Sequence, residues 1–494
     1  QDIFIAKYDA SGNYVWANRI GNTDADGGNA VKTDASGNVY VTGYFSGLVD
    51  FDPGSGAVNL TSSGLSDIFT AKYAASGSLV WAKRIGGTGD DRGMGLVLDG
   101  SANLHVTGYF NGTVDFDPGG ATVNLVSLGG NDVFIAKYTA SGDYTWARQI
   151  GGTGDDRGLA LALDGDNNLL ATGYFTNTVD FDPGAGTANL SATGQNDVYV
   201  AKYNASGSYV WAVPVGGNGD DRGLALTVDG SSNVYMAGYF NGLNVDFNPG
   251  AGAALLGSAG EDACLLRLTP AGVYDWAINW GVYGAKPAYM ECRSVARDAA
   301  GNVYATGSFA GYLVDFDPGP GSATLTSNGI QDIFIVKYDA SGNYLWCRSI
   351  GGTNDDFGFG IALDADNNVY IAGSFRGSNV DFDPGAGVAN MSSAGSDDIF
   401  IAKFDASGNY VWSRSIGGVN EDRSLGIALD AGNNIYITGF FQGTNIDFDP
   451  GAATAQRATA RGIAESANPR VDAERATRRA RSCATAAGAC GLAP

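Results

Sequence analysis

Histidine is almost missing from this chain, which has a single one, His105, among 494 residues. One histidine excludes a His-rich zinc site, and neither a Gly-Lys-Ser/Thr phosphate loop nor a nucleophile elbow is present. His105 occupies the position that Tyr40 has in its own segment, so we expect a strand side chain and not the general base of a Ser-His-Asp triad. The sequence therefore predicts that the protein is not an enzyme.

Cysteine is also scarce. None of the cysteines belongs to a Cys-x-x-Cys pair, and none recurs at a fixed interval; they are Cys264, Cys292, Cys347, Cys483 and Cys490. The first three stand where other segments of the chain have Phe, Gly and Ala, which predicts small buried apolar residues. A disulfide between Cys264 and Cys292 remains an alternative, because sequence spacing does not decide the pairing.

Long apolar runs are missing as well. None approaches the roughly 18 residues that span a bilayer, so we predict no membrane insertion. Lys and Arg number 29 against 52 Asp and Glu, which gives a net charge of −23. Such acidity repels nucleic acid and anionic membranes and attracts Ca²⁺ or basic partners, although it also simply keeps a protein in solution. No signal peptide opens the chain, which begins inside a repeated segment, so we expect a processed or excised product.

What the chain has in abundance is repetition. The phrase Asp-Ile-Phe-Ile-Ala-Lys-Tyr, or a close variant, starts at Asp2, Asp67, Asp132, Asp197, Asp262, Asp332 and Asp398. The first four intervals are 65 residues each, and the next two are 70 and 66. A period of this kind indicates a solenoid, a propeller or an array, in which each unit buries its apolar face against the next.

Each repeat predicts four antiparallel strands, which we name A, B, C and D in chain order. In the first complete copy, β-branched and aromatic residues alternate at 29–33, 39–51, 67–73 and 79–85, with Gly, Asn and Asp between these runs. Four-stranded units repeated radially are propeller blades, whereas a linear β-solenoid uses shorter rungs and parallel pairing. The short hairpin turns therefore favour the propeller.

The two ends of the chain favour a closed ring. The chain begins with strands C and D (2–20), continues through complete sets and ends with A and B alone (425–448). We predict an all-β, seven-bladed β-propeller over residues 1–452. It closes when the C-terminal A and B strands pair with the N-terminal C and D strands, because this pairing removes both exposed sheet edges.

The composition changes abruptly after Gly451. Residues 453–494 contain seven Arg, three acids and no aromatic residue, and they are rich in Ala. Such a break predicts a disordered tail, with a basic arm on the acidic body or a translated frame error as alternatives.

Three motifs recur through the repeats. They are Gly-Gly-Thr-Gly-Asp-Asp-Arg-Gly at 86–93 and 151–158, a Leu-Asp-x-x-x-Asn turn, and Val-Tyr-Val-Thr-Gly at 39–43. This pattern resembles SBBP, a seven-bladed β-propeller repeat of bacterial secreted and surface proteins. The resemblance implies a propeller, a secreted or cell-surface location and a binding or scaffold role, and it supplies no catalytic residue.

The B–C and D–A connections leave a propeller on one face, and both carry acids. Each B–C connection contains Asp-Phe-Asp-Pro-Gly or a close variant, and alternating carboxylates on a tight loop suit Ca²⁺. The loop lacks a third acid and the distal Glu of an EF-hand, so a turn capped by its own carboxylates is the alternative. The candidate Ca²⁺ ligands are Asp50, Asp52, Asp115, Asp117, Asp180, Asp182, Asp246, Asp315, Asp317, Asp381, Asp383, Asp447 and Asp449.

The D–A connections carry pairs of adjacent acids, and three copies read Asp-Asp-Arg. These pairs are candidates for a partner or anion site near the central channel, or else they form a salt-bridge network between blades. The candidate residues are Asp90, Asp91, Asp155, Asp156, Asp220, Asp221, Asp355 and Asp356.

Seven tryptophans share one position in strand D. A ring at this position fills the space between blades or, alternatively, stacks on a sugar. Trp280 is out of register and lies in the irregular stretch 276–292, which we predict to be a recognition loop with Trp280 as a binding residue.

Taken together, these features favour an extracellular or cell-surface scaffold for binding or adhesion, stabilised by Ca²⁺ in the B–C loops. Two alternatives stay open: a carbohydrate-binding or carbohydrate-active protein that uses its acidic loops, and a purely structural module of a larger surface protein. We expect a monomer whose ligand is a protein or a glycan and not a nucleic acid.

Overall fold

The computed structural model describes residues 1–258, 260–281, 289–443, 446–449, 451 and 456–457. The chain divides into two compact units, Gln1–Thr459 and Ala460–Pro494. The second unit lies outside the described residues, and so does most of the predicted tail, 453–494. The first unit contains only β-strands in its described part.

Seven four-stranded antiparallel sheets make up the first unit. Blade 1 has β3 (Gly27–Thr33), β4 (Val39–Phe45), β7 (Asp67–Tyr73) and β8 (Leu79–Ile85). Blade 2 has β9 (Arg92–Leu98), β10 (Leu104–Phe110), β13 (Asp132–Tyr138) and β14 (Tyr144–Ile150). Blade 3 has β15 (Arg157–Leu163), β16 (Leu169–Phe175), β19 (Asp197–Tyr203) and β20 (Tyr209–Val215). Blade 4 has β21 (Arg222–Val228), β22 (Val234–Phe240), β25 (Asp262–Leu268) and β26 (Tyr274–Trp280).

The last three blades follow the same order. Blade 5 has β27 (Tyr289–Arg297), β28 (Val303–Ala310), β31 (Asp332–Tyr338) and β32 (Tyr344–Ile350). Blade 6 has β33 (Phe357–Leu363), β34 (Val369–Phe375), β37 (Asp398–Phe404) and β38 (Tyr410–Ile416). Blade 7 is composite, with β39 (Arg423–Leu429) and β40 (Ile435–Phe441) from the end of the repeats and β1 (Asp2–Tyr8) and β2 (Tyr14–Ile20) from the N-terminus.

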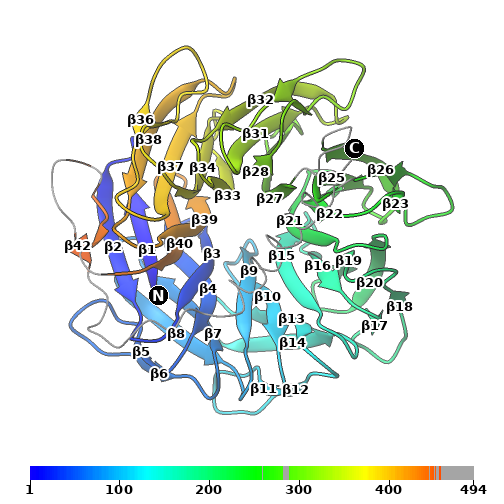
Figure 1. Ribbon diagram of the computed structural model, residues 1–494. Helices are drawn as coiled ribbons and strands as arrows, with labels where there is room; N and C mark the ends of the chain where they lie inside the picture. Colours follow the sequence, from blue (N-terminus) through cyan, green and yellow to red (C-terminus); the bar gives the residue numbers. More distant parts are fainter. Residues whose placement is uncertain (259, 282–288, 444–445, 450, 452–455, 458–494) are drawn as a thin grey trace, which may run out of the picture. The chain divides into compact units, whose positions relative to one another are not determined.

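The predicted ring closure is confirmed. β1 pairs with β40 over seven residue pairs, from Asp2 opposite Phe441 to Tyr8 opposite Ile435. The A strands β3, β9, β15, β21, β27, β33 and β39 each contact the next, and β39 contacts β3 (Figure 1). The protein is therefore a closed, seven-bladed β-propeller, with strand A of each blade nearest the axis.

Packing between blades explains the composition of the strands. The B and C strands are buried on both faces, as in β4, because each sheet lies between two neighbouring sheets. The hydrophobic clusters accordingly run across blade boundaries; one of them joins Ile3 and Ile5 of blade 7 to Val31 and Val41 of blade 1. Most of the core is thus shared by adjacent blades, which is why a single repeat cannot fold alone.

The repeated tryptophan of strand D fastens each blade to the next. The indole Nε1 of Trp16 donates a hydrogen bond to the Ala75 carbonyl at 3.0 Å, in the C–D turn of blade 1. The ring lies on Gly77, where an added Cβ would come within 2.9 Å of it and where φ is +88°. Trp412 packs on Gly12 in the same way across the boundary between blades 6 and 7. The predicted packing role of these rings is confirmed.

A feature that the sequence did not reveal is a second, small sheet in each B–C connection. The seven two-stranded hairpins are β5 (Leu48–Asp50) with β6 (Asn59–Thr61), β11 (Thr113–Asp115) with β12 (Asn124–Val126), β17 (Thr178–Asp180) with β18 (Asn189–Ser191), β23 (Val245–Asp246) with β24 (Leu255–Leu256), β29 (Val314–Asp315) with β30 (Thr324–Leu325), β35 (Val380–Asp381) with β36 (Asn390–Met391), and β41 (Ile446–Asp447) with β42 (Gln456–Arg457). The hairpins β11–β12 and β17–β18 lie at the rim of the ring (Figure 1).

Candidate functional site

The acidic connections lie side by side on one face of the ring. Single bridges join the D–A loop to the end of the preceding B–C connection, as between Ser66 and Asp90, and to the hairpin of the following blade, as between Gly86 and Asp115. We call the surface made by the D–A loops and the B–C hairpins the loop face. The A–B and C–D turns, at the opposite ends of the same strands, form the turn face.

The second acid of each D–A pair is a buried clamp. The Asp156 carboxylate accepts hydrogen bonds from the Gly152 and Thr176 backbone N–H groups, each at 2.8 Å, and thereby ties the D–A loop to the start of the B–C hairpin. Side chains with this role are fully buried, and they are Asp26, Asp91, Asp156, Asp221, Asp356 and Asp422. The predicted residues Asp91, Asp156, Asp221 and Asp356 thus face the interior and not a ligand.

Burial also sets the electrostatics of these clamps. It raises the pKa of Asp156 to about 7 and that of Asp422 to about 8, although the two N–H bonds to each carboxylate act in the opposite direction. The Asp that begins each C strand is a second buried acid nearby, and its charge raises the clamp pKa further, as Asp132 does for Asp156. Burial likewise raises the pKa of Asp132 to about 6. The loop face therefore has a layer of carboxyls that titrate near neutral pH.

In four repeats the first acid of the pair binds the Arg two residues later, in a network between blades. Arg92 Nε lies 3.0 Å from Asp90 Oδ1, and Arg222 Nε lies 2.9 Å from Asp220 Oδ1. The Arg92 guanidinium also lies over the ring of Tyr44 in the preceding blade, 4.1 Å from its centre. The geometry favours the salt-bridge interpretation of these acids.

The network leaves part of its negative charge accessible. The Asp155 side chain is 43% exposed although it is paired with Arg157. The Glu421 side chain is 31% exposed and pairs with Arg423, whereas Asp355 is only 9% exposed. Carboxylate oxygens in D–A loops such as that of Asp155 can therefore meet a partner without leaving the network.

The carboxylates of the Asp-Phe-Asp-Pro-Gly segment cap the tip of the B–C hairpin. Asp50 Oδ1 accepts the N–H groups of Asp52 at 3.0 Å and Val58 at 2.8 Å, and Asp52 Oδ1 accepts that of Gly54 at 2.8 Å. The Phe51 side chain between them is fully buried. The same caps recur in the other hairpins, and the corresponding candidates are Asp115, Asp117, Asp180, Asp182, Asp246, Asp315, Asp317, Asp381, Asp383, Asp447 and Asp449.

This geometry supports the turn-cap interpretation of the motif. In blade 4 the second acid is replaced by Asn248, whose Oδ1 accepts the Gly250 N–H at 2.9 Å just as the aspartates do. Within the described residues, no group of three or more His, Cys, Asp or Glu side chains is arranged to hold a metal ion. Binding of Ca²⁺ by these loops stays a prediction.

Trp280 does not lie on a recognition surface, and this corrects our prediction. Its side chain is fully buried and stacks on the rings of Phe316 and Tyr338, with centroids 6.1 and 5.9 Å away. It faces Ala263 across strands β25 and β26, at a position where blade 1 pairs Ile68 with Ile85. The small Ala leaves the space that the large indole fills. Residues 282–288 of the predicted recognition loop lie outside the described residues.

The same region replaces a clamp by an apolar side chain. Met290 stands at the position that Asp91 occupies in the loop between blades 1 and 2. The Met290 backbone N–H donates to the Glu261 carbonyl, and the Asp91 backbone N–H donates to the Ser66 carbonyl, both at 2.9 Å. Met290 is fully buried. The junction of blades 4 and 5 is thus where the chain departs most from its own repeat.

The histidine and the three cysteines among the described residues are buried as well. Cys264, Cys292 and Cys347 are free thiols, so the alternative of a Cys264–Cys292 disulfide is not adopted. His105 lies on β10 as expected, fully buried, and burial lowers its pKa to about 4. None of these groups reaches solvent to act as a nucleophile or base.

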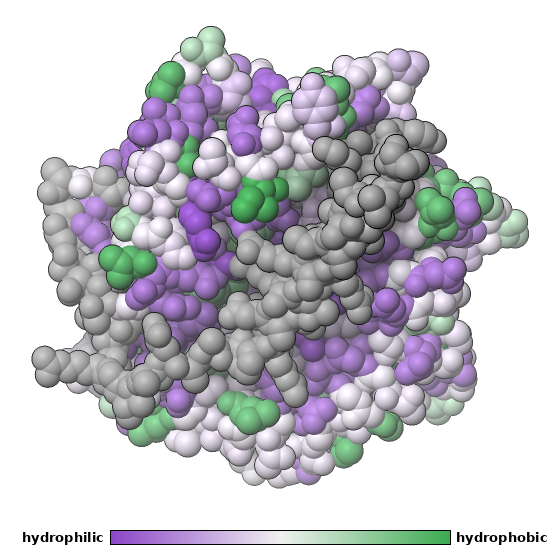
Figure 2. All heavy atoms as spheres, in the orientation of Figure 1, coloured by the Kyte–Doolittle hydropathy of each residue, from purple (hydrophilic) through white to green (hydrophobic). Residues whose placement is uncertain are grey.

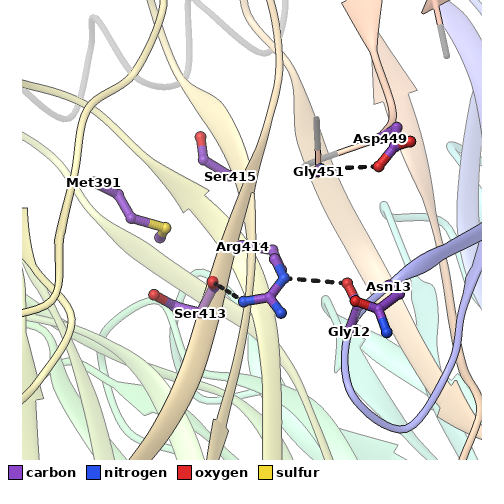
Figure 3. A pocket seen from close by; sticks show the side chains of 8 residues that line it. All are labelled: Gly12, Asn13, Met391, Ser413, Arg414, Ser415, Asp449 and Gly451. Atoms are coloured by element: carbon purple, nitrogen blue, oxygen red, sulfur yellow. Dashed lines mark hydrogen bonds between the residues drawn. The ribbon is translucent and has the colours of Figure 1, made fainter. Parts of the chain in front are cut away.

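A cavity of about 370 Å³ lies where blade 6 meets the N-terminal part of blade 7 (Figure 3). Arg414 dominates its wall, and the guanidinium donates to the carbonyls of Ser11, Gly12 and Ser413 at 2.9–3.2 Å. Arg348 makes the same bonds to Ser407 and Gly408 one blade earlier. Because the arrangement repeats and its donors are engaged, the cavity is a packing feature of the blade boundary.

The described part of the chain contains no helix with the length and apolar character that crossing a bilayer requires.

Comparison with known proteins agrees with the fold. Residues 345–382 match the family described as SBBP, Beta-propeller repeat. An uncharacterized WD repeat-containing protein of Acanthamoeba polyphaga mimivirus is 26% identical over 507 aligned residues, which cover 88% of this chain and 36% of that protein. The regulatory protein FlaEY of Caulobacter vibrioides is 30% identical over 111 residues, covering 22% of this chain and 12% of that protein. The chain thus spans about a third and about an eighth of the lengths of these relatives.

Among solved structures, the WD40 domain of Pan2 from Neurospora crassa aligns with a TM-score of 0.40 at 9% identity, covering 83% of this chain and 88% of that one. Sqt1 from Chaetomium thermophilum aligns with a TM-score of 0.38 at 11% identity, covering 88% of this chain and 97% of that one. The internal repeat, the closed ring of seven sheets and the family match lead to one conclusion. The chain is a seven-bladed β-propeller, and its residues 345–382 match the SBBP β-propeller repeat.

Proposed function

We propose that this propeller is a non-catalytic scaffold that binds a partner protein with a basic surface through its loop face. The observation that carries the proposal is the gathering of the D–A and B–C carboxylates on one side of the ring, in a chain whose net charge is −23. Complementary charge speeds association and selects partners over a large surface. The matched relatives are described as a WD repeat-containing protein and a regulatory protein, which agrees with a binding role.

The proposal includes a secreted or cell-surface location and a role in adhesion, and the resemblance of the repeat motifs to SBBP supports both. Binding of Ca²⁺ by the B–C carboxylates is a separate prediction. The B–C carboxylates are stable as turn caps without a metal, so the scaffold function does not depend on one.

Charge neutralisation on one face tests the proposal. The test variant is Asp52→Asn/Asp117→Asn/Asp182→Asn, and Asn248 shows that Asn preserves the cap. The matched control, Asp143→Asn/Asp166→Asn/Asp366→Asn, removes the same charge from exposed positions in turns on the turn face. The probe is a labelled oligolysine peptide, followed by fluorescence anisotropy at several salt concentrations.

We expect the loop-face variant to bind the peptide about tenfold more weakly, because each exposed charge pair contributes roughly 0.5 kcal/mol. Affinity should fall as salt rises, since salt screens exposed charges. Equal weakening by the turn-face control would show that net charge alone attracts the peptide, and would refute a loop-face site.

A further inference from the structure

One hairpin of the loop face has an unusual residue in a left-handed backbone conformation. In blades 4, 5 and 6 the B–C connection has one residue more than in blades 1–3, directly before the buried Val of the hairpin, and this residue has positive φ. It is asparagine in blades 4 and 6, with φ values of 63° at Asn244 and 56° at Asn379. In blade 5 the residue is Leu313, with φ of 57°.

Leucine is poorly suited to this backbone conformation. Its Cβ approaches the following carbonyl oxygen, a contact that glycine lacks and that asparagine tolerates better than a bulky apolar residue does. The hairpin nevertheless holds it there: the Leu313 N–H donates to Thr326 Oγ1 at 3.0 Å, as the Asn379 N–H donates to Ser392 Oγ. Next to it, Val314 is fully buried and anchors the hairpin. The strain is therefore built into a rigid element.

No burial of the Leu313 side chain offsets this backbone strain. The Leu313 side chain is 51% exposed, and that of the preceding Tyr312 is 69% exposed. The corresponding residues of blade 6 are the polar pair Ser378 and Asn379. An exposed leucine in a strained conformation beside an exposed tyrosine does not stabilise the fold. Strained residues and exposed apolar patches concentrate at binding sites.

The hairpin of the neighbouring blade also exposes apolar side chains. Leu243 occupies in blade 4 the position of Tyr312 and is 76% exposed, and Leu255 on the second strand of the same hairpin is 56% exposed. Figure 2 shows hydrophobic side chains gathered at the edge of the ring over β23, the first strand of that hairpin. We call Leu243, Leu255, Tyr312 and Leu313 the apolar strip.

We propose that the apolar strip of blades 4 and 5 is the anchor point of the loop face, where a partner protein inserts an apolar side chain from within a basic surface. Charge complementarity identifies the partner. The strip lies on hairpins that carry Asp246, Asp315 and Asp317, in a chain with a net charge of −23. A tyrosine held on a hairpin and surrounded by polar residues is typical of an interface hot spot. This inference rests on the proposed function and deepens it.

The variants can be taken from the repeats themselves. Tyr312→Ser/Leu313→Asn reproduces the sequence of blade 6 and should fold as blade 6 does. The control is Val80→Thr, which removes a 53% exposed apolar side chain from strand β8 and copies Thr145 of blade 2. The probes are two labelled peptides, one of alternating Lys and Leu and the other of alternating Lys and Ser.

We expect the wild type to bind the Lys/Leu peptide more tightly than the Lys/Ser peptide. The double variant should lose at least fivefold in affinity for the Lys/Leu peptide, while Val80→Thr stays within twofold of the wild type. If the wild type binds the two peptides equally, or if the double variant binds like the wild type, the strip is not an anchor although the acidic face still binds. If the wild type binds neither peptide, the proposed function itself fails.

A second measurement needs no ligand. The single change Leu313→Asn should raise the thermal unfolding midpoint by about 1–2 °C, because it removes strain without removing a buried contact. A lower midpoint would mean that Leu313 supports the fold, and the inference would be overturned.

Discussion

The buried clamp of the D–A loop gives the sharpest test of the structure. The change Asp156→Ala removes the acceptor of two backbone N–H groups, those of Gly152 and Thr176, each bonded at 2.8 Å. Asp156 is fully buried, so water has little access to replace the lost acceptor. A buried N–H group without a partner costs about 1–3 kcal/mol. Because the bond from Thr176 is only partly buried, we expect a total loss of about 2–5 kcal/mol in the free energy of unfolding.

The measurement is urea unfolding at pH 6. Burial raises the pKa of Asp156 to about 7, so at pH 6 the folded protein holds this carboxyl mainly in its neutral form. Loss of a buried charge then contributes little, and the lost hydrogen bonds dominate. Hydrogen exchange adds a local readout, in which the amides of Gly152 and Thr176 should lose protection.

The control is Asp182→Ala in the same blade. Its Oδ1 accepts the exposed Gly184 N–H at 2.8 Å, and water can replace that acceptor. We expect a loss below about 1 kcal/mol, in the range of surface substitutions. If Asp156→Ala costs no more than Asp182→Ala, the clamp does not hold the loop and the reasoning from its burial is wrong.

Three further predictions concern pH, ring closure and metal. Burial raises the pKa of the six clamp carboxyls from 3.8 to about 7–8, so the folded state binds more protons than the unfolded state between these values. Stability should therefore fall as pH rises from about 4 to 7–8, with a lower melting temperature at pH 8 than at pH 5.5, and the reverse order would contradict the burial of these acids. Trp412→Ala removes the ring that packs on Gly12, and should cost about 2–4 kcal/mol and expose β1 and β2 to early proteolysis; unchanged proteolysis would argue against its role in closure. If the B–C carboxylates bind Ca²⁺ as predicted, a chelator should lower the melting temperature by several degrees, and a change within about 1 °C would leave these carboxylates as turn caps without a metal.

The strands and their closure could be predicted from the sequence because both follow from periodicity. Alternating apolar residues mark the long strands, and the half blades at Asp2 and Phe441 have only each other as partners. The B–C hairpins were missed because prediction from periodicity needs longer strands. Strands of two or three residues, such as Leu48–Asp50, are too short to show an alternating pattern.

The site was harder to predict because neighbouring acids look alike in sequence. Asp155 and Asp156 are adjacent, yet one is 43% exposed and the other fully buried. Only the approach of Thr176 from the B–C connection distinguishes them, and that contact is between distant residues. For Trp280, by contrast, the sequence did contain a signal. Ala263 stands where blade 1 has Ile68, and so small a residue in the core predicts a large side chain opposite it.

Mapping a bound basic peptide by hydrogen exchange tests the central claim, that the loop face is the binding surface. The oligolysine peptide is added to the wild-type chain, and amide protection is compared between the two faces of the ring. The account predicts added protection in the D–A loops and B–C hairpins, with the A–B and C–D turns unchanged. Protection confined to the A–B and C–D turns, or spread equally over both faces, would contradict it.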